Sequence, residues 1–338
     1  MQNIIGIDVG TTSIKCSSIL PDGSHYDARC NTPLFRKNSL NNQEITFSPR
    51  KVWNSVCNLI LPILKKFDTV IISVVCQAPS LTFWNEKGEG VGISYLSYYG
   101  DPTQNTYFQR RHKTAMRLAL ANRIISEKEI MYVSGLTGYI VFMLTGQLTL
   151  DSVTAWELGI ESQEDALDMQ VRFKPYIFPC VLPPSAKIPL NCADLDIVHG
   201  FSLVGTTDSA VLPISIIPEF SDYYIYLGSW GSLLQSKIRT IEDYNIQYYS
   251  GLLNNWLVSI PDFIAKVTAN IQELDNLFLT IQKIINQRCK VAICGGLTKA
   301  KKEYIQFLID THFRKEQAII VTEKEGAFGA FRLAQFFH

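Results

Sequence analysis

Several features that would assign this chain to a function class at once are missing from its 338 residues. No apolar stretch approaches the length needed to span a bilayer, and no positively charged segment followed by an apolar core opens the chain. None of the eight cysteines forms a CxxC pair, and the five histidines do not fall at ligand spacing beside them, which argues against a zinc site. We therefore expect a reduced, cytoplasmic protein that does not enter membranes.

The chain also lacks an excess of charge of either sign. Lys and Arg number 31 and Asp and Glu number 31, so the formal net charge is zero. A general nucleic-acid binder needs a basic face, so this balance argues against one. Hydrophobic residues make up 47% and charged residues 18%, which predicts a globular protein long enough to build two cores.

The common nucleotide-binding loops are absent as well. No G-x-x-x-x-G-K-[ST] segment occurs, which excludes a P-loop enzyme. The run GEGVG at 88–92 lacks the Rossmann spacing and carries Glu89 where a pyrophosphate would lie, so we interpret it as a hairpin turn. Any nucleotide site in this chain must be built from other elements.

What is present is an alternation of strand-like and helix-like segments, which predicts an α/β fold with mostly parallel sheets and flanking helices. We interpret the proline- and cysteine-rich stretch 178–196 as a connector between two domains, because the order of elements begins again after residue 205. The predicted strands are 4–9, 14–20, 70–75, 223–227, 232–236, 290–294 and 318–322. The predicted helices are 49–61, a long region ending at 143 and broken at 134–135, 208–217, 260–285, 299–311 and 325–337.

The first candidate site is the turn that follows the first strand. Gly10, Thr11 and Thr12 offer backbone N–H groups and hydroxyls that could cradle phosphate oxygens. Asp8 would repel phosphate but would suit a hydrated Mg²⁺ that neutralises it, and Lys15 could add positive charge. A plain β-turn would explain the same residues, and both interpretations stay open.

Later segments repeat this chemistry. Asp208, in VGTTDS, could accept a proton in phosphoryl transfer, or it could simply cap the helix predicted to start there. Gly228 and Ser229 lie in a second strand–turn–strand segment, and this duplication suggests two similar domains that face a shared cleft. Gly295 and Gly296 end a strand before a helix, where they could admit a flat ligand or form a tight βα turn.

Taken in order, these motifs resemble the FGGY carbohydrate kinases of the actin/hexokinase/Hsp70 superfamily. Gln77 looks like the family's Gly-Gln turn, and the block 139–146 with Asp151 and Ala155 looks like its "LTG…D…A" helix and loop. The resemblance touches nearly the whole chain. The ordered motifs are IGIDVGTTSIK, VGTTDSA, IYLGSWGSLL, AICGGLTK and EGAFGAFRLA.

The resemblance implies two actin-like, ribonuclease H-like domains with mixed sheets flanked by helices, and ATP with Mg²⁺ bound between them. Residues 1–199 would form the N-terminal domain, with the first phosphate turn and the sugar-binding side. Residues 200–338 would form a shortened C-terminal domain. The expected reaction is ATP-dependent phosphorylation of a hydroxyl on a small sugar, ketose or polyol. The sequence does not decide the oligomeric state, for which a homodimer is the candidate.

The residues that match the family's motifs are assigned roles accordingly. Asp208 would be the catalytic base, and Asp8 and Asp208 would hold the metal. The remaining assignments are Gly10, Thr11, Thr12, Lys15, Gly228 and Ser229 for phosphate, Gly295, Gly296 and Lys299 for adenosine, and Gln77, Ala78 and Asp101 for the substrate.

The chain also departs from the family's pattern. Ala78 and Pro79 offer no side-chain hydrogen bonds where substrate-binding side chains usually follow, and Asp101 is only a candidate substitute for the family's Trp-x-Asp-x-Arg segment. Leu297 replaces a third adenosine glycine, Trp230 follows the second phosphate turn, and the interval 236–291 is much shorter than in typical members. Two alternatives therefore stay open: a catalytically weak kinase-like protein that binds nucleotide or sugar, and a scaffold without a nucleotide site.

Overall fold

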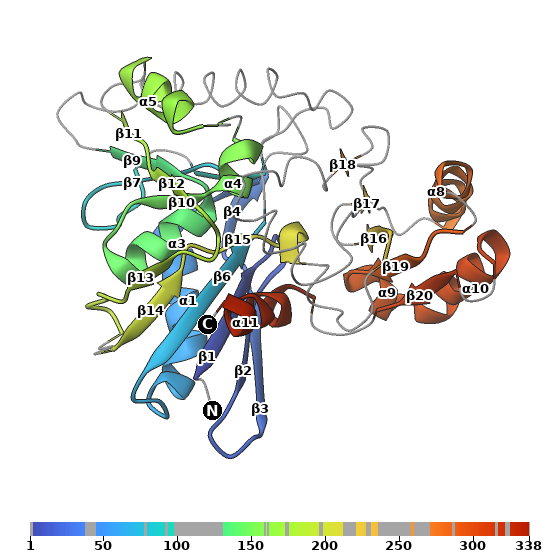
Figure 1. Ribbon diagram of the computed structural model, residues 1–338, viewed down its shortest axis with the longest axis horizontal. Helices are drawn as coiled ribbons and strands as arrows, with labels where there is room; N and C mark the ends of the chain where they lie inside the picture. The colour runs from blue at the N-terminus through green and yellow to red at the C-terminus, as the bar shows by residue number, and fades with distance from the viewer. Residues whose placement is uncertain are drawn as a thin grey trace. The chain divides into compact units, whose positions relative to one another are not determined.

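The structure is a computed structural model in which the chain divides into two compact units (Figure 1). Unit 1 comprises Met1–Gly100, Thr106–Val211 and Gly326–His338, and unit 2 comprises Asp101–Asn105 and Leu212–Glu325. The described residues are 3–37, 45–77, 80–91, 94–97, 131–158, 160, 162–172, 176–195, 199–211, 221–227, 231–235, 258–259, 271–285, 288–314, 317–321 and 325–337.

Unit 1 is built on a mixed sheet in which strands β14, β6 and β1 run parallel, and β2 and β3 continue it antiparallel beyond β1. Strand β13 pairs antiparallel with β14, and the short strand β15 pairs parallel with β6. The strands are β1 (Ile4–Val9), β2 (Ser13–Ile19), β3 (His25–Asn31), β6 (Val70–Cys76), β13 (Lys187–Pro189), β14 (Gly200–Leu203) and β15 (Thr206–Thr207).

Successive residues of β1 face opposite sides of this sheet. Ile5, Ile7 and Val9 are buried in the core that also contains side chains of helix α1 (Pro49–Leu64). On the other side, a Cβ on Gly6 would lie 2.1 Å from the Ala327 carbonyl oxygen of helix α11 (Glu325–Phe337). The strand thus alternates between bulky apolar residues and a position where only glycine fits, as the period of two in a strand allows. Figure 1 shows α1 and α11 on opposite faces of the sheet.

Smaller sheets and helices complete unit 1. Trp84 is fully buried and packs edge-on against Tyr139 with 5.2 Å between ring centroids, which fixes one small sheet against helix α3. The sheets are β4 (Leu34–Lys37), β5 (Ile45–Phe47) and β8 (Ser94–Ser97); β7 (Thr82–Trp84), β9 (Met131–Ser134) and β11 (Tyr176–Ile177); and β10 (Thr149–Asp151) with β12 (Cys180–Leu182). The helices are α3 (Leu136–Thr145), α4 (Ser152–Glu157), α5 (Gln163–Arg172) and the 3-10 turn η2 (Ser209–Val211).

Unit 2 repeats the strand pattern of unit 1. Strand β16 pairs antiparallel with β17 and parallel with β19, just as β1 pairs antiparallel with β2 and parallel with β6. The predicted fold class, α/β with two such mixed sheets, is confirmed. The strands are β16 (Tyr223–Leu227), β17 (Gly231–Gln235), β18 (Val258–Ser259), β19 (Val291–Cys294) and β20 (Ala318–Ile320), and the helices are α8 (Ile271–Ile284), α9 (Gly296–Ala300) and α10 (Lys302–His312).

Three sequence-based interpretations of local structure are wrong. Met131–Ser134, expected in a helix, is strand β9, because it pairs with β7 and places Val133 in a core. The stretch 178–196, expected to be only a connector, contains β12 and β13, which pair with β10 and β14 inside unit 1. The helix predicted from 208 is replaced at its start by η2, and residues 212–217 lie outside the described part of the chain.

The end of the first sheet lies beyond the domain limit expected from the sequence. Strands β14 and β15 follow residue 199, yet both pair with β6 in unit 1. Helix α11 also belongs to unit 1, although the chain reaches it from unit 2. The domain limits 1–199 and 200–338 stay a prediction. Among the described residues, no helix combines the length and the apolar character needed to cross a membrane.

The close approach of α11 to β1 predicts a stability defect. Gly6→Ala should lower the free energy of unfolding by at least about 2 kcal/mol, because the new methyl group meets the backbone of α11, which cannot move aside. Gly23→Ala is the control in the same unit: Gly23 has φ 82° but nothing within 4 Å, so it should cost about 1 kcal/mol from backbone strain alone. Urea unfolding followed by circular dichroism measures both, and equal costs would contradict the packing argument.

Candidate active site

Three strands of unit 1 end side by side at one edge of the sheet. Strand β6 lies between β1 and β15, and both Val9 and Thr207 are paired with Cys76. The N–H of Gln77 donates to the Val9 carbonyl at 2.9 Å, and the N–H of Asp208 donates to the Cys76 carbonyl at 3.0 Å. The three strands are parallel, so these are carboxyl ends, the edge at which α/β sheets bind ligands. Since β6 separates β1 from β15, those strands lie about 10 Å apart.

Asp8 is buried near the end of β1 and is held from two sides. The Lys15 ammonium donates to its Oδ2 at 2.9 Å from the paired position on β2. A Cβ on Gly326 would lie 2.1 Å from the same Oδ2, so α11 begins directly against the carboxylate. Oδ1 is buried and has no hydrogen-bond partner among the described residues. The carboxylate is therefore fixed, with one oxygen still able to accept a ligand.

The turn after β1 brings a second oxygen without a partner to this edge. The N–H of Gly10 donates to the Ser13 carbonyl at 3.1 Å, and the Thr32 hydroxyl donates to the Gly10 carbonyl at 2.7 Å, so the turn is closed on itself. The Thr11 hydroxyl is buried and unpartnered among the described residues, while Thr12 is exposed. Both residues were predicted to bind phosphate. Lys15, predicted to do the same, has its ammonium at Asp8.

Three aspartates lie near the end of β6. Asp8 pairs with Val75, the N–H of Asp208 donates to the Cys76 carbonyl, and Asp151 accepts a hydrogen bond from Thr206 of the neighbouring strand β15. Burial raises the pKa of the Cys76 thiol well above its usual value, and the negative charges of Asp8, Asp208 and Asp151 act in the same direction. Asp8 and Asp208, predicted to act together, are thus both close enough to influence one buried thiol. Both lie in unit 1, whereas Asp208 was expected to come from the C-terminal half.

Asp151 is the aspartate of this group to which the sequence analysis assigned no role. It is fully buried, and its Oδ1 accepts hydrogen bonds from the N–H of Val153 at 3.0 Å, the N–H of Thr154 at 2.9 Å and the Thr206 hydroxyl at 3.1 Å. Burial raises the pKa of Asp151 from 3.8 to about 6 despite these bonds. Its place in the "LTG…D…A" pattern was the signal in the sequence, but only the fold reveals its link to Thr206.

The two glycines predicted to bind adenosine differ in their surroundings. Gly295 has φ 109°, and a Cβ there would lie 2.3 Å from the Leu227 carbonyl oxygen, so the tight turn against β16 requires glycine by itself. Gly296 is exposed and has nothing within 4 Å of an added Cβ. Packing against the described residues therefore does not require glycine at this position. Gly296 is therefore the one of the pair whose glycine suits an approaching ligand.

Several predicted site residues cannot be placed. Ala78, Asp101, Gly228 and Ser229 lie outside the described residues, as does the side chain of Lys299. Gln77 is described and half-buried, directly beside the Gly10 turn and Asp208.

The residues at this edge fit a magnesium ion only in part. Within the described part of the chain, no three Asp, Glu, His or Cys side chains are arranged to hold a metal. The unpartnered Oδ1 of Asp8 is a suitable hard ligand, and Mg²⁺ is commonly bound by one or two carboxylates together with substrate phosphates. Asp8 would thus hold a magnesium ion that arrives with the nucleotide.

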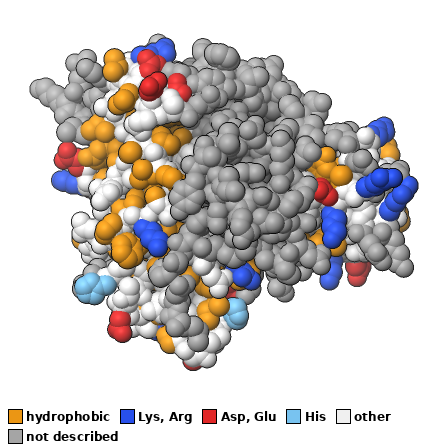
Figure 2. Space-filling view, viewed as in Figure 1, with side chains coloured by type: hydrophobic (Ala, Val, Ile, Leu, Met, Phe, Trp, Pro, Cys, Tyr) orange, Lys and Arg blue, Asp and Glu red, His pale blue; other side chains and the backbone are white. Residues whose placement is uncertain are grey.

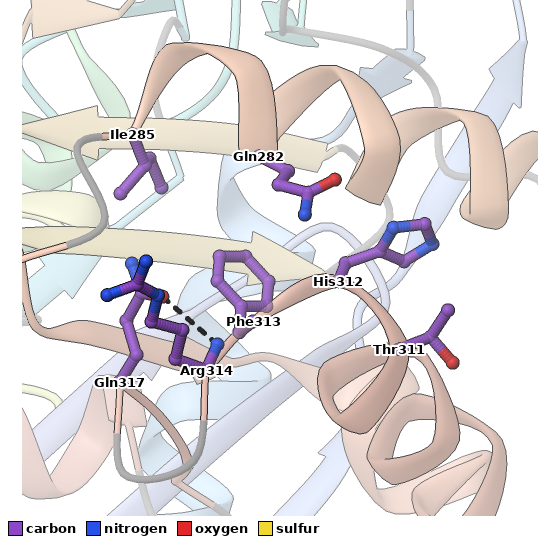
Figure 3. A pocket seen from close by; sticks show the side chains of 7 residues that line it. All are labelled: Gln282, Ile285, Thr311, His312, Phe313, Arg314 and Gln317. Atoms are coloured by element: carbon purple, nitrogen blue, oxygen red, sulfur yellow. Dashed lines mark hydrogen bonds between the residues drawn. The ribbon is translucent and has the colours of Figure 1, made fainter.

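A cavity of about 290 Å³ lies elsewhere, in unit 2 (Figure 3). Phe313 and Ile285 form its apolar side, and Gln282 and Gln317 bring amides to it. His312 also lines it, and its Nε2 lies 2.9 Å from Asp275 Oδ1. None of the predicted site residues lines this cavity, so we give it no part in the chemistry. Among the described residues on the face of unit 1 seen in Figure 2, Lys and Arg side chains are few and scattered.

Comparisons with known proteins agree with this architecture. In sequence, the chain matches no protein-family model and no curated protein at a significant level. In structure, it is similar to gluconate kinase from Lactobacillus acidophilus (TM-score 0.65, 16% identity, 99% of this chain and 89% of that one). It is likewise similar to ligand-bound xylulose kinase from the same organism (TM-score 0.64, 17% identity, 100% of this chain and 89% of that one). A third similar structure is Plasmodium falciparum glycerol kinase with ADP (TM-score 0.68, 11% identity, 99% of this chain and 89% of that one).

The fold is that of these carbohydrate kinases. The resemblance to FGGY-type kinases expected from the motifs is confirmed at this level, over nearly the whole length of the chain. With identities of 11 to 17%, the likeness establishes the two-domain actin-like fold and leaves the reaction to be argued from the residues.

The buried charge of Asp151 predicts a pH dependence of stability. Because its folded pKa is raised above 3.8 to about 6, the folded state holds the proton more tightly than the unfolded state. The free energy of unfolding of the wild type, relative to that of Asp151→Asn, should therefore fall as the pH rises from 3.8 to about 6, by at most about 1.4 kcal/mol per pH unit. Above pH 6 the difference between the two proteins should be constant.

Urea unfolding of both proteins from pH 4 to pH 8 measures this difference, in which the titration of other groups largely cancels. Asp168→Asn is the control, because it removes a carboxylate that is half exposed on α5. A relative stability that rises with pH in this window would contradict the raised pKa.

The incomplete metal site leads to a second prediction. Mg²⁺ alone at millimolar concentration should leave the melting temperature unchanged, whereas Mg²⁺ with ATP should raise it, because only the nucleotide supplies the remaining ligands. Thermal unfolding with each ligand alone and with both together provides the measurement. A large shift with Mg²⁺ alone would mean that the protein holds a complete metal site.

Proposed function

We propose that the protein is an ATP-dependent kinase that phosphorylates a hydroxyl group of a small sugar, ketose or polyol. The observation that carries the proposal is the alignment of three strand ends in unit 1, which gathers Asp8, the Gly10–Thr12 turn, Gln77 and Asp208 at one edge. The kinase fold supports it, because this edge is where α/β sheets bind ligands.

In the proposed reaction, Asp208 acts as the general base. Its backbone is anchored to β6 while its side chain is partly exposed, which suits a group that must reach a bound substrate. Its carboxylate would accept the proton of the acceptor hydroxyl as that oxygen attacks the γ-phosphorus, and ADP would leave. Gln77, which directly follows β6, would help to orient the acceptor.

The phosphates would be received by the turn after β1. The backbone N–H groups of Thr11 and Thr12 and the unpartnered Thr11 hydroxyl are donors for phosphate oxygens. A magnesium ion at Asp8 Oδ1 would neutralise phosphate charge and polarise the transferred group. Lys15 would fix the Asp8 carboxylate and add positive charge.

Unit 2 would contribute the rest of the nucleotide site. We assign Gly228 and Ser229 to phosphate, and Gly295, Gly296 and Lys299 to adenosine, while Ala78 and Asp101 stay assigned to the acceptor. A cytoplasmic location, where ATP is abundant, and a homodimeric assembly belong to the same proposal.

The test is a panel of pentuloses, hexuloses and polyols with Mg-ATP, followed by ADP release. We expect turnover of at least one acceptor, and Asp208→Asn should lower kcat by about 10²- to 10⁴-fold with little change in the calorimetric Kd for ATP. The loss should fall on kcat because the amide can occupy the same space but cannot accept the proton.

Asp168→Asn is the matched control, since it removes an exposed carboxylate of the same unit and should leave kcat unchanged. Binding of ATP without turnover of any acceptor would favour the catalytically weak alternative, for which the Ala78-Pro79 turn is the supporting feature. A melting temperature that does not respond to nucleotide would favour the scaffold.

A further inference from the structure

The short segment that carries Asp208 is anchored by a carboxylate from a distant part of the chain. The Thr206 hydroxyl donates to Asp151 Oδ1 at 3.1 Å, across 55 positions of sequence. We propose that Asp151 is a positioning residue that, through Thr206, fixes where the Asp208 carboxylate lies. This inference rests on the proposed role of Asp208 as the base.

Other contacts also restrain Thr206, the residue that bonds to Asp151. Thr206 is fully buried, its backbone pairs with Val75 of β6, and its carbonyl accepts a hydrogen bond from the Thr137 hydroxyl at 3.2 Å. Before it, Gly205 has φ 75°, and a Cβ there would lie 2.2 Å from the Val74 carbonyl oxygen. The chain therefore enters β15 through a tight turn at Gly205, and the Asp151 bond adds to the restraints on Thr206.

From Thr206 the constraint reaches Asp208 within two residues. Thr207 pairs with Cys76, and the N–H of Asp208 donates to the Cys76 carbonyl at 3.0 Å. The backbone of the base is thus tied to the same strand that lies beside β1 and its turn. A loss of the Thr206 anchor would let the start of this segment shift, and with it the direction in which the carboxylate points.

A simple capping role does not account for Asp151. Its Oδ1 accepts two N–H groups at the start of α4, but that helix has only six residues, and an uncharged Asn or Ser could serve the same two donors. A fully buried aspartate is costly, and its Oδ2 has no hydrogen-bond partner among the described residues. What the carboxylate adds is a strong acceptor shared by the α4 cap and by Thr206.

The decisive variant is Thr206→Val, which keeps the branched shape and removes only the hydroxyl, leaving the α4 cap intact. We expect kcat to fall about 10- to 100-fold with the ATP Kd within about twofold, because misplacement of a base affects the chemical step rather than nucleotide binding. Thr206→Ser restores the donor and should recover most of the lost kcat. In the Asp208→Asn background, Thr206→Val should have no further effect on the residual rate.

The matched control is Thr149→Val in strand β10. Thr149 is buried two residues before Asp151, and its hydroxyl has no partner among the described residues, so the same change removes no hydrogen bond. Its kcat should equal that of the wild type. A Thr206→Val variant with wild-type kcat and a lowered melting temperature would show that the bond serves stability alone and would overturn the proposal.

A second readout does not require turnover. Amide hydrogen exchange followed by mass spectrometry should be faster by about fivefold in the peptide containing residues 205–209 of Thr206→Val, and unchanged in the peptide containing Val153 and Thr154. If the wild type phosphorylates no acceptor, the proposed function fails, yet faster exchange would still support the anchor. Unchanged exchange at 205–209 would overturn the anchor whatever the activity.

Discussion

The position of strand β6 between β1 and β15 is the constraint on which the candidate site depends. Two parallel ladders meet on this strand, and both place their last pair at Cys76. Because the register of a buried strand is strongly specified, the backbone pairing alone brings the turn after β1, Gln77 and Asp208 to one edge. The geometry of the site is thus a property of the backbone ladder, and the side chains supply the chemistry.

The sequence predicted the fold where local patterns and global fold agree. Strand β1 and helix α11 have the predicted bounds. The apolar residues of β1 alternate, as in a strand, and the small and apolar residues of α11 recur at helical spacing, so each pattern fits one kind of element only. Met131–Ser134 was misassigned because its apolar residues fit both periods, and only pairing with β7 decides between them. Short strands such as β12 and β15 depend on partners far along the chain, which local patterns do not contain.

In the candidate site, too, some features could be predicted from the sequence and others could not. Asp8, Gly10 and Asp208 could be selected from the sequence because their motifs resemble those of the FGGY kinases, whereas a plain turn and a helix cap explained the residues by themselves. The surroundings that make them usable could not. The contact of Gly326 with Asp8 and the hydrogen bond from Thr206 to Asp151 each join segments that are far apart in the chain. The groups proposed to act can therefore be named from the sequence, whereas the contacts that hold them in place are visible only in the fold.

Helix α11 has a consequence for how the protein is made. It covers one face of β1 with close contacts at Gly6 and Gly326, although it lies far from that strand in the sequence. All of unit 2 is translated between that strand and its cover. During synthesis, the face of β1 that α11 covers therefore lacks this cover until α11 has been translated, and nascent chains would need protection from aggregation over that interval.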